Sequence, residues 1–171
     1  NQEEQLLKQA LKIQKLLESP EISTLPGGSL PTTFELLTLL GFLYFKAQGC
    51  HWVMVETGLG GRLDATNVVI PQASLITPIE LEDQDFLVDS LEEIAVEKAG
   101  IIKKGRRVFS AFQQEEALSI IRETCQRRDS ELFYLPDSLE NSRYTAKEGI
   151  FSTELQWKDL TFPNSFQLSM L

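Results

Sequence analysis

The sequence has 171 residues, and 42% of them are hydrophobic, which suffices for a folded domain with a core. The formal net charge of −9 argues against a general nucleic-acid or membrane-surface binder. The two cysteines have neither metal-ligand nor disulfide spacing, so we expect a reduced, cytoplasmic setting.

The first part of the chain predicts two helices and one strand. Apolar residues recur at helical spacing over 2–18. Thr32 and Glu35 form a capping-box pattern, which predicts a second helix reaching about Ala47. That helix is apolar on nearly all sides, so we expect it to be buried. The Val-rich run Trp52–Glu56 is typical of a central parallel strand.

The second part predicts strands that alternate with helices. The strands are expected at 73–79, 107–112 and 132–135, and the helices at 91–99 and 115–128. Gly100 is expected as the glycine that ends the helix at 91–99. This alternation predicts an α/β fold with a mostly parallel sheet and flanking helices.

The pattern of apolar and polar residues changes beyond Pro136. Aromatic and aliphatic residues are there separated by polar ones, which favours antiparallel hairpins. We therefore expect one partial domain over 1–171, with an α/β core at 1–135 and a β-rich extension at 136–171.

The segment most indicative of a binding site is the glycine-rich run that begins at Gly58 and ends at Asp64. It begins two positions after Glu56, at the predicted end of a strand, where ligands bind in open α/β sheets. Glycines allow backbone to approach a ligand closely. The run does not match the dinucleotide fingerprint, because Leu63 stands in place of the third glycine. The run Gly100–Arg107 has phosphate-loop spacing but lacks the required Lys-Ser/Thr.

Four carboxylates follow the strand predicted at 73–79, namely Glu80, Glu82, Asp83 and Asp85. Together with Glu56 they could converge on one Mg²⁺ ion, which prefers oxygen ligands. The alternative is a solvated acidic loop, the usual place of a run of charges.

Lys98 shares a helix face with Leu91 and Ile94, a face expected to point inward. Either its side chain bends outward and complements the helix dipole, or it is a buried amine with a shifted pKa. His51 is the single histidine, so a Ser-His-Asp triad cannot form within the chain.

Two blocks of sequence resemble the folylpolyglutamate synthase and dihydrofolate synthase family of the Mur ligase superfamily. They are Glu56-Thr-Gly-Leu-Gly-Gly-Arg-Leu-Asp-Ala-Thr-Asn67 and Ile94-Ala-Val-Glu-Lys-Ala-Gly-Ile-Ile-Lys103. The helix start Pro31-Thr-Thr-Phe-Glu35 is also similar, so the resemblance covers about 20–135. It implies a Mur-ligase central-domain fold and an ATP-dependent ligase. In this family ATP phosphorylates a carboxyl of the pteridine substrate, and the amine of glutamate attacks the acyl phosphate.

The resemblance also implies roles for individual residues. Glu56 would ligate Mg²⁺ beside the nucleotide phosphates, and Lys98 would be carbamylated. Asp83 stands where the family usually has a histidine metal ligand, so its oxygen would bind the metal instead. Four residues would contact the pterin: Thr32, Phe34, Asp64 and Ala65.

In the family, a phosphate loop lies upstream of the part that resembles this chain, and a separate C-terminal domain lies downstream. We therefore expect an interior section of the ATPase domain that is inactive by itself. The implied substrates are dihydropteroate or folates, L-glutamate and ATP, in a cytoplasmic protein that is monomeric at full length. Two alternatives stay open: a non-catalytic relative used as a binding or scaffold module, and a different Mur-type ligase.

Overall fold

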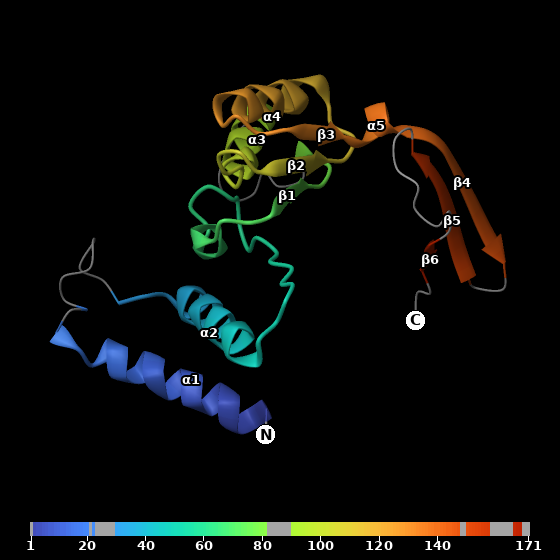
Figure 1. Cartoon of the computed structure of the whole chain (residues 1–171). Coiled ribbons are helices and arrows are strands. Elements are labelled where there is room, and N and C mark those ends of the chain that lie inside the picture. Colours follow the sequence, from blue (N-terminus) through green and yellow to red (C-terminus); the bar gives the residue numbers. More distant parts are fainter. Residues whose placement is uncertain are drawn as a thin grey trace. The chain divides into compact units, whose positions relative to one another are not determined.

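The computed structural model describes residues 2–20, 22, 30–81, 90–147, 150–157 and 166–168. The chain divides into two compact units (Figure 1). The first unit comprises 1–59 and 63–69, and the second comprises 60–62 and 70–171. In the described part of the chain, no helix is long and apolar enough to cross a membrane.

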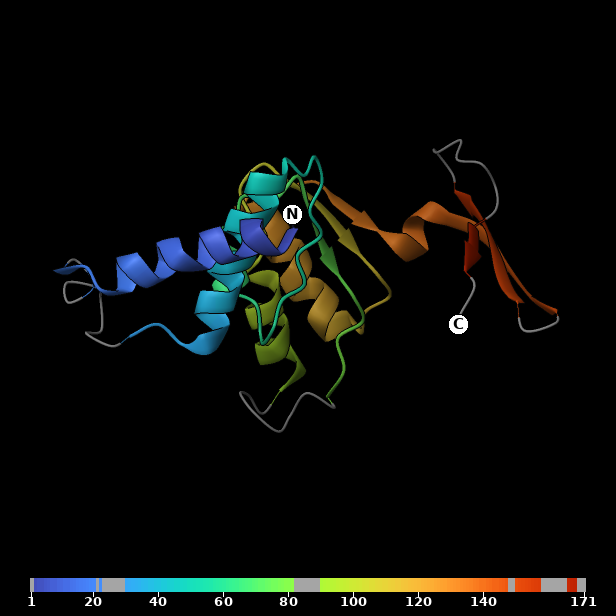
Figure 2. The ribbon, with the colours of Figure 1, turned by 90° about the horizontal axis from the view of Figure 1, so that it is seen from below.

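The first unit is helical. Helix α1 spans Gln2–Leu17 and contacts helix α2, which spans Thr33–Gln48, as Figures 1 and 2 show. The predicted capping box of α2 is confirmed: the Glu35 amide donates to the Thr32 hydroxyl at 3.2 Å, and the Thr32 amide donates to the Glu35 carboxylate at 2.7 Å. A short 3-10 helix, η2, spans Ala65–Val68.

Two predictions for the first unit are wrong. Helix α2 holds no buried residue, although its sequence is apolar on nearly all sides. The run 52–56 is not a strand, and the side chains of Trp52 and Met54 are 83% and 97% exposed. A strand requires a hydrogen-bonded neighbour, and no described strand pairs with this segment. An apolar pattern indicates that a segment packs against other residues, but it does not identify a neighbouring strand.

The second unit contains a parallel sheet with strand order β1-β2-β3. Strand β1 spans Ala73–Ile76, β2 spans Arg107–Ser110, and β3 spans Leu132–Tyr134. The intervening helices are α3 at Leu91–Ala99 and α4 at Glu115–Arg127. The α/β class with a parallel sheet is confirmed, although each strand is shorter than predicted.

The core of this unit lies on one face of the sheet, under α3 and α4. Strand residues Ile76 and Val108 point toward the helices, and both are buried. The opposite face carries Leu75 and Phe109, which are exposed, and the Phe109 ring stacks on Phe133 with centroids 4.9 Å apart. Both helices can cover the same face because each crossover between parallel strands takes the same hand.

The C-terminal part of the chain forms a second, antiparallel sheet. Strand β4 spans Leu139–Lys147, β5 spans Ile150–Trp157, and β6 spans Phe166–Leu168, in the order β4-β5-β6. The short helix α5, at Leu135–Ser138, precedes it. The region therefore has antiparallel pairing, in contrast to the parallel sheet before it.

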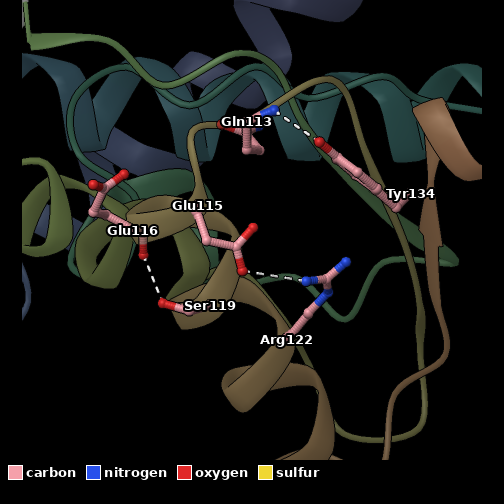
Figure 3. A network of polar contacts seen from close by, with 6 residues as sticks. All are labelled: Gln113, Glu115, Glu116, Ser119, Arg122 and Tyr134. Atoms are coloured by element: carbon pink, nitrogen blue, oxygen red, sulfur yellow. Dashed lines mark hydrogen bonds and ion pairs between the residues drawn. The ribbon is translucent and has the colours of Figure 1, made fainter.

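A buried glutamine ties together the segments that follow β1 and β2. The side-chain amide of Gln113 donates to the Thr77 carbonyl at 2.8 Å and to the Ser110 hydroxyl at 3.2 Å, while its oxygen accepts from the Ile79 amide at 3.0 Å. The Gln113 backbone amide donates to the Tyr134 hydroxyl (Figure 3). One side chain thus satisfies backbone groups that the short strand β1 leaves unpaired.

The Tyr134 ring also lies beneath a cation. The Arg122 guanidinium is 5.8 Å from the ring centroid, and it is 3.5 Å from the Glu115 carboxylate (Figure 3). Helix α4 is therefore joined to the end of β3 by a cation–π contact as well as by packing.

The Gln113→Ala substitution should lower the free energy of unfolding by about 2–4 kcal/mol, because it leaves the buried Ile79 amide and Thr77 carbonyl unpaired. Urea unfolding followed by circular dichroism measures this loss. The matched control is Gln114→Ala, since Gln114 is exposed and makes no side-chain capping bond. Equal stability of the two variants would contradict the role assigned to Gln113.

Candidate functional site

The glycine-rich turn is closed by the carboxylate of Asp64. One oxygen, Oδ2, accepts from the amides of Gly58 at 3.1 Å and Leu59 at 2.9 Å. The other, Oδ1, accepts from the Thr66 amide at 2.8 Å and from the Thr66 hydroxyl. Asp64 is also the N-cap residue of η2. Four donors from its own turn therefore surround this carboxylate.

This environment lowers the pKa of Asp64. Partial burial by itself raises the pKa of the carboxyl, but hydrogen bonds from the Thr66 side chain and from the Leu59, Thr66 and Gly58 amides lower it more. The carboxylate is consequently charged at neutral pH and holds the turn in its ionised form.

Phe34 lies against the first glycine of the turn. A Cβ added at Gly58 would overlap the end of the Phe34 ring, with the ring Cε2 only 2.9 Å away. Thr32 caps the helix that carries Phe34, and Ala65 opens η2 directly after Asp64. The structure thus places Phe34 next to the turn that Asp64 closes, while Thr32 is engaged in the capping box.

Glu56 lies just before the turn, and its side chain is exposed. Among the described residues, no side chain or backbone group pairs with its carboxylate. Glu56 and Asp64, eight positions apart, therefore differ: one carboxylate is saturated by donors of its own turn, and the other is open to an external partner.

The tip of the turn, residues 60–62, belongs to the second unit and docks on the last turn of α3. The Arg62 amide donates to the Glu97 carbonyl at 2.9 Å. The Arg62 guanidinium contacts the Glu97 carboxylate through Nε at 2.9 Å and through Nη2 at 2.8 Å. Gly61 is buried, and a Cβ there would lie 2.6 Å from the Glu97 carbonyl oxygen.

Gly100 ends α3 as predicted, but not in the left-handed conformation that a glycine often adopts after a helix. Its φ is −61° and its ψ is −13°, which are ordinary right-handed helical values. A Cβ at Gly100 would instead overlap Arg62, whose Cα would be 2.6 Å away. A glycine is needed here for the close approach of Arg62 rather than for backbone conformation.

Lys98 is half-buried on α3, next to Glu97 in sequence. A Cβ at Gly61 would lie 3.1 Å from the Lys98 Cα, so the turn tip touches the backbone at this lysine. The proposed metal ligand Asp83 lies outside the described residues, as do Glu82 and Asp85. In the described ranges, no three His, Cys, Asp or Glu side chains gather closely enough to hold a metal ion.

Sequence reasoning did not identify the Arg62–Glu97 pair or the buried Gln113. The two members of the pair are 35 positions apart, so no local spacing reveals them. Two sequence features could have indicated the pair. Arg62 lies inside a glycine-rich run, and Glu97 directly precedes Lys98 on a helix face expected to point inward.

Comparison with known proteins identifies close relatives in sequence. Dihydrofolate synthase/folylpolyglutamate synthase of Bacillus subtilis is 45% identical over 109 residues, which cover 63% of this chain and 25% of that protein. Dihydrofolate synthetase of Saccharomyces cerevisiae is 45% identical over 107 residues, covering 59% and 25%. The chain therefore spans about a quarter of the length of the curated relatives it matches. No protein-family model matches the chain.

Solved structures of similar fold bear the same names. Folylpolyglutamate synthase of Thermotoga maritima has a TM-score of 0.79 and 28% identity, and the match covers 98% of this chain and 37% of that one. The enzyme of Mycobacterium tuberculosis, solved with ADP and AMPPCP, has a TM-score of 0.78 and 26% identity, covering 89% and 35%. The family resemblance and the fold class inferred from the sequence are thereby confirmed.

The turn should loosen when Asp64 is protonated. Because the folded-state pKa of Asp64 is lowered, its stabilising contribution is fully present above the ordinary value of about 3.9 and is lost as the pH falls through the lower folded value. We expect the NMR signals of the Gly58 and Leu59 amides to titrate with a midpoint below that ordinary value.

The variant Thr66→Val provides a second test of the Asp64 titration. It removes the hydroxyl donor to Oδ1 but keeps the Thr66 amide, so the midpoint should move upward toward the ordinary pKa of an aspartate. A midpoint in the unaltered protein at or above about 3.9 would show that the carboxylate is not held as described.

Proposed function

We propose that this chain, which is related in sequence and fold to one section of the folylpolyglutamate and dihydrofolate synthases, forms part of an ATP-dependent ligase. The ligase joins L-glutamate to dihydropteroate or to folates in the cytoplasm. The observation that carries the proposal is the turn closed by Asp64. It lies inside the run 56–67, which resembles that family, and it leaves Glu56 exposed at its start.

The proposed ligase reaction has two steps, phosphoryl transfer and amide formation. ATP transfers its γ-phosphoryl group to the substrate carboxylate, which yields an acyl phosphate and ADP. The amine of glutamate then attacks the acyl carbon, an amide bond forms, and inorganic phosphate leaves with the loss of a proton from the amine. The 171 residues contain no phosphate-loop motif, and the part that cradles the triphosphate is therefore not assigned to any of them in this proposal.

Glu56 fits the role of a Mg²⁺ ligand. Its carboxylate is exposed and has no partner in the described part of the chain, and hard divalent cations prefer carboxylate oxygen. When bound, Mg²⁺ offsets the charge that develops on the transferred phosphoryl group. Asp83 is proposed as a second oxygen ligand, in the place of the histidine usual in the family.

Lys98 is proposed to carry a carbamate. Its neutral amine adds to carbon dioxide, a nitrogen–carbon bond forms, and one proton is released to solvent. The product is an anionic group that can support a metal site, at a position where the unmodified side chain would be a cation. Lys98 is half-buried on the last turn of α3, beside the tip of the glycine-rich turn.

The pterin side of the site comprises Thr32, Phe34, Asp64 and Ala65. Phe34 supplies an aromatic ring beside the turn, suited to stacking on a planar heterocycle. All of the acceptor capacity of the Asp64 carboxylate is engaged by Gly58, Leu59 and Thr66. Asp64 therefore acts on the pterin through the backbone shape that it maintains.

The Glu56→Ala substitution should lower Mg²⁺-dependent turnover by about a hundredfold or more, because it removes a ligand of the ion that stabilises the phosphoryl group. The measurement is glutamate- and ATP-dependent product formation by the protein that includes its phosphate loop. The control is Glu131→Ala, which removes an exposed carboxylate at the start of β3. Turnover equal to that of the control, with the fold retained, would remove Glu56 from the metal site.

The carbamate on Lys98 can be detected without an activity assay. Protein equilibrated with ¹³C-bicarbonate should show a carbamate carbon signal, and the signal should be lost in Lys98→Arg, because a guanidinium does not add to carbon dioxide at neutral pH. Lys103→Arg serves as the matched control, since Lys103 is also half-buried in the same unit. A signal that persists in Lys98→Arg would show that the modification is elsewhere.

A further inference from the structure

We propose that Arg62 is a positioning residue for Lys98: by docking on Glu97 it fixes the last turn of α3, from which Lys98 projects. This inference rests on the proposed function of Lys98. Arg62 itself does not contact the reacting groups in this proposal, and it acts through the backbone of α3.

The first contact is between backbone groups. The last carbonyls of a helix have no partner within the helix, and the Glu97 carbonyl is one of these. It accepts from the Gly100 amide at 3.1 Å and also from the Arg62 amide at 2.9 Å. The glycine-rich turn therefore provides a cap for α3 from a distant part of the sequence.

The second contact is between charged side chains. Both Nε and Nη2 of Arg62 reach the same oxygen of Glu97, whose side chain is only 22% exposed. The positive charge also lies at the C-terminal end of α3, where the helix dipole favours it. The ion pair and the backbone bond thus join the same two residues, Arg62 and Glu97, although the Arg62 side chain is itself 53% exposed.

The third contact is steric. The Glu97 carbonyl and the Lys98 Cα lie 2.6 and 3.1 Å from the positions that a Cβ on Gly61 would reach, and Arg62 fills the place of a Cβ on Gly100. The two atoms near Gly61 belong to the backbone, and the Arg62 Cα and Cβ near Gly100 are held in place by the backbone, so none of them can move aside as the end of a side chain could. The turn tip and α3 are therefore interlocked on both sides of Lys98.

An ordinary surface ion pair would not have this effect. Arg127 and Glu123 on α4 are one turn apart, separated by 3.8 Å, and their side chains are 67% and 63% exposed. Such pairs contribute little to stability. The Arg62–Glu97 pair instead joins residues 35 positions apart and is combined with a backbone bond and two close glycine contacts.

The test compares Arg62→Ala with Arg127→Ala in the protein that includes its phosphate loop. We expect Arg62→Ala to lower kcat about tenfold or more, because small displacements of a catalytic group are costly, while KM for ATP stays within about twofold. Arg127→Ala should leave both values unchanged. The ¹³C carbamate signal of Lys98 should weaken in Arg62→Ala only.

Two further measurements separate positioning from a general loss of stability. Added bicarbonate should restore part of the kcat of Arg62→Ala by mass action, whereas it cannot restore a protein that is merely unfolded. The exchanged pair Arg62→Glu with Glu97→Arg should recover activity relative to Arg62→Ala, because it re-forms the ion pair while keeping the backbone bond.

The outcomes distinguish this inference from the proposed function. If Lys98→Arg is inactive but Arg62→Ala matches Arg127→Ala in kcat and in carbamate signal, the inference is overturned and the proposed function stands. An Arg62→Ala defect that bicarbonate leaves unchanged also overturns the inference. A fully active Lys98→Arg overturns both.

Discussion

The close approach of the turn tip, residues 60–62, to the last turn of α3 is the constraint that fixes this tip within the second unit. It requires the absence of a side chain at Gly61 and at Gly100, because the Glu97 carbonyl and Arg62 occupy the space that a Cβ would take. Arg62 then completes the contact with a backbone bond and an ion pair. The chain passes from one compact unit to the other and back within this single turn.

The two carboxylates of the turn are chemically different although both are acidic residues of one short segment. The charge of Asp64 is stabilised by four donors of its own turn, which lowers its pKa and commits it to a structural role. Glu56 has no such donors and remains exposed. In the proposed metal site, Asp64 therefore maintains the backbone of the turn, and the Glu56 carboxylate is left open for the ion.

The second unit contains a buried polar side chain, Gln113, that connects its strands. The Gln113 side-chain amide bonds to two backbone groups after β1, at Thr77 and Ile79, and to the Ser110 hydroxyl at the end of β2, while its backbone amide donates to the hydroxyl of Tyr134 at the end of β3. Strands of three or four residues leave many backbone groups unpaired at their ends. The buried glutamine compensates for that shortness at the edge of the sheet where ligands bind in α/β proteins.

Local features were predictable from the sequence because they depend on neighbours in the chain. The capping box at Thr32 and Glu35, the helices α3 and α4, and the parallel strands follow from spacing and from residue type. The glycine-rich turn stands out in the sequence for the same reason, and its role as a binding segment stays a prediction. Two predictions that depended on packing against distant segments were wrong. The run 52–56 has an apolar pattern but no strand beside it among the described residues, and α2 has no buried residue.

What the sequence determined by itself was therefore the fold class, the helices and the three strands of the parallel sheet, whereas the residues that it suggests for metal binding and reaction stay predictions. Only the tertiary structure decided how Asp64 and Arg62 are used. Asp64 is surrounded by donors that become available only when the turn closes, and Arg62 meets Glu97 only when two segments 35 positions apart come together. Periodicity and spacing describe contacts between near neighbours, whereas these contacts arise from the folded backbone, which brings distant groups to hydrogen-bond distance.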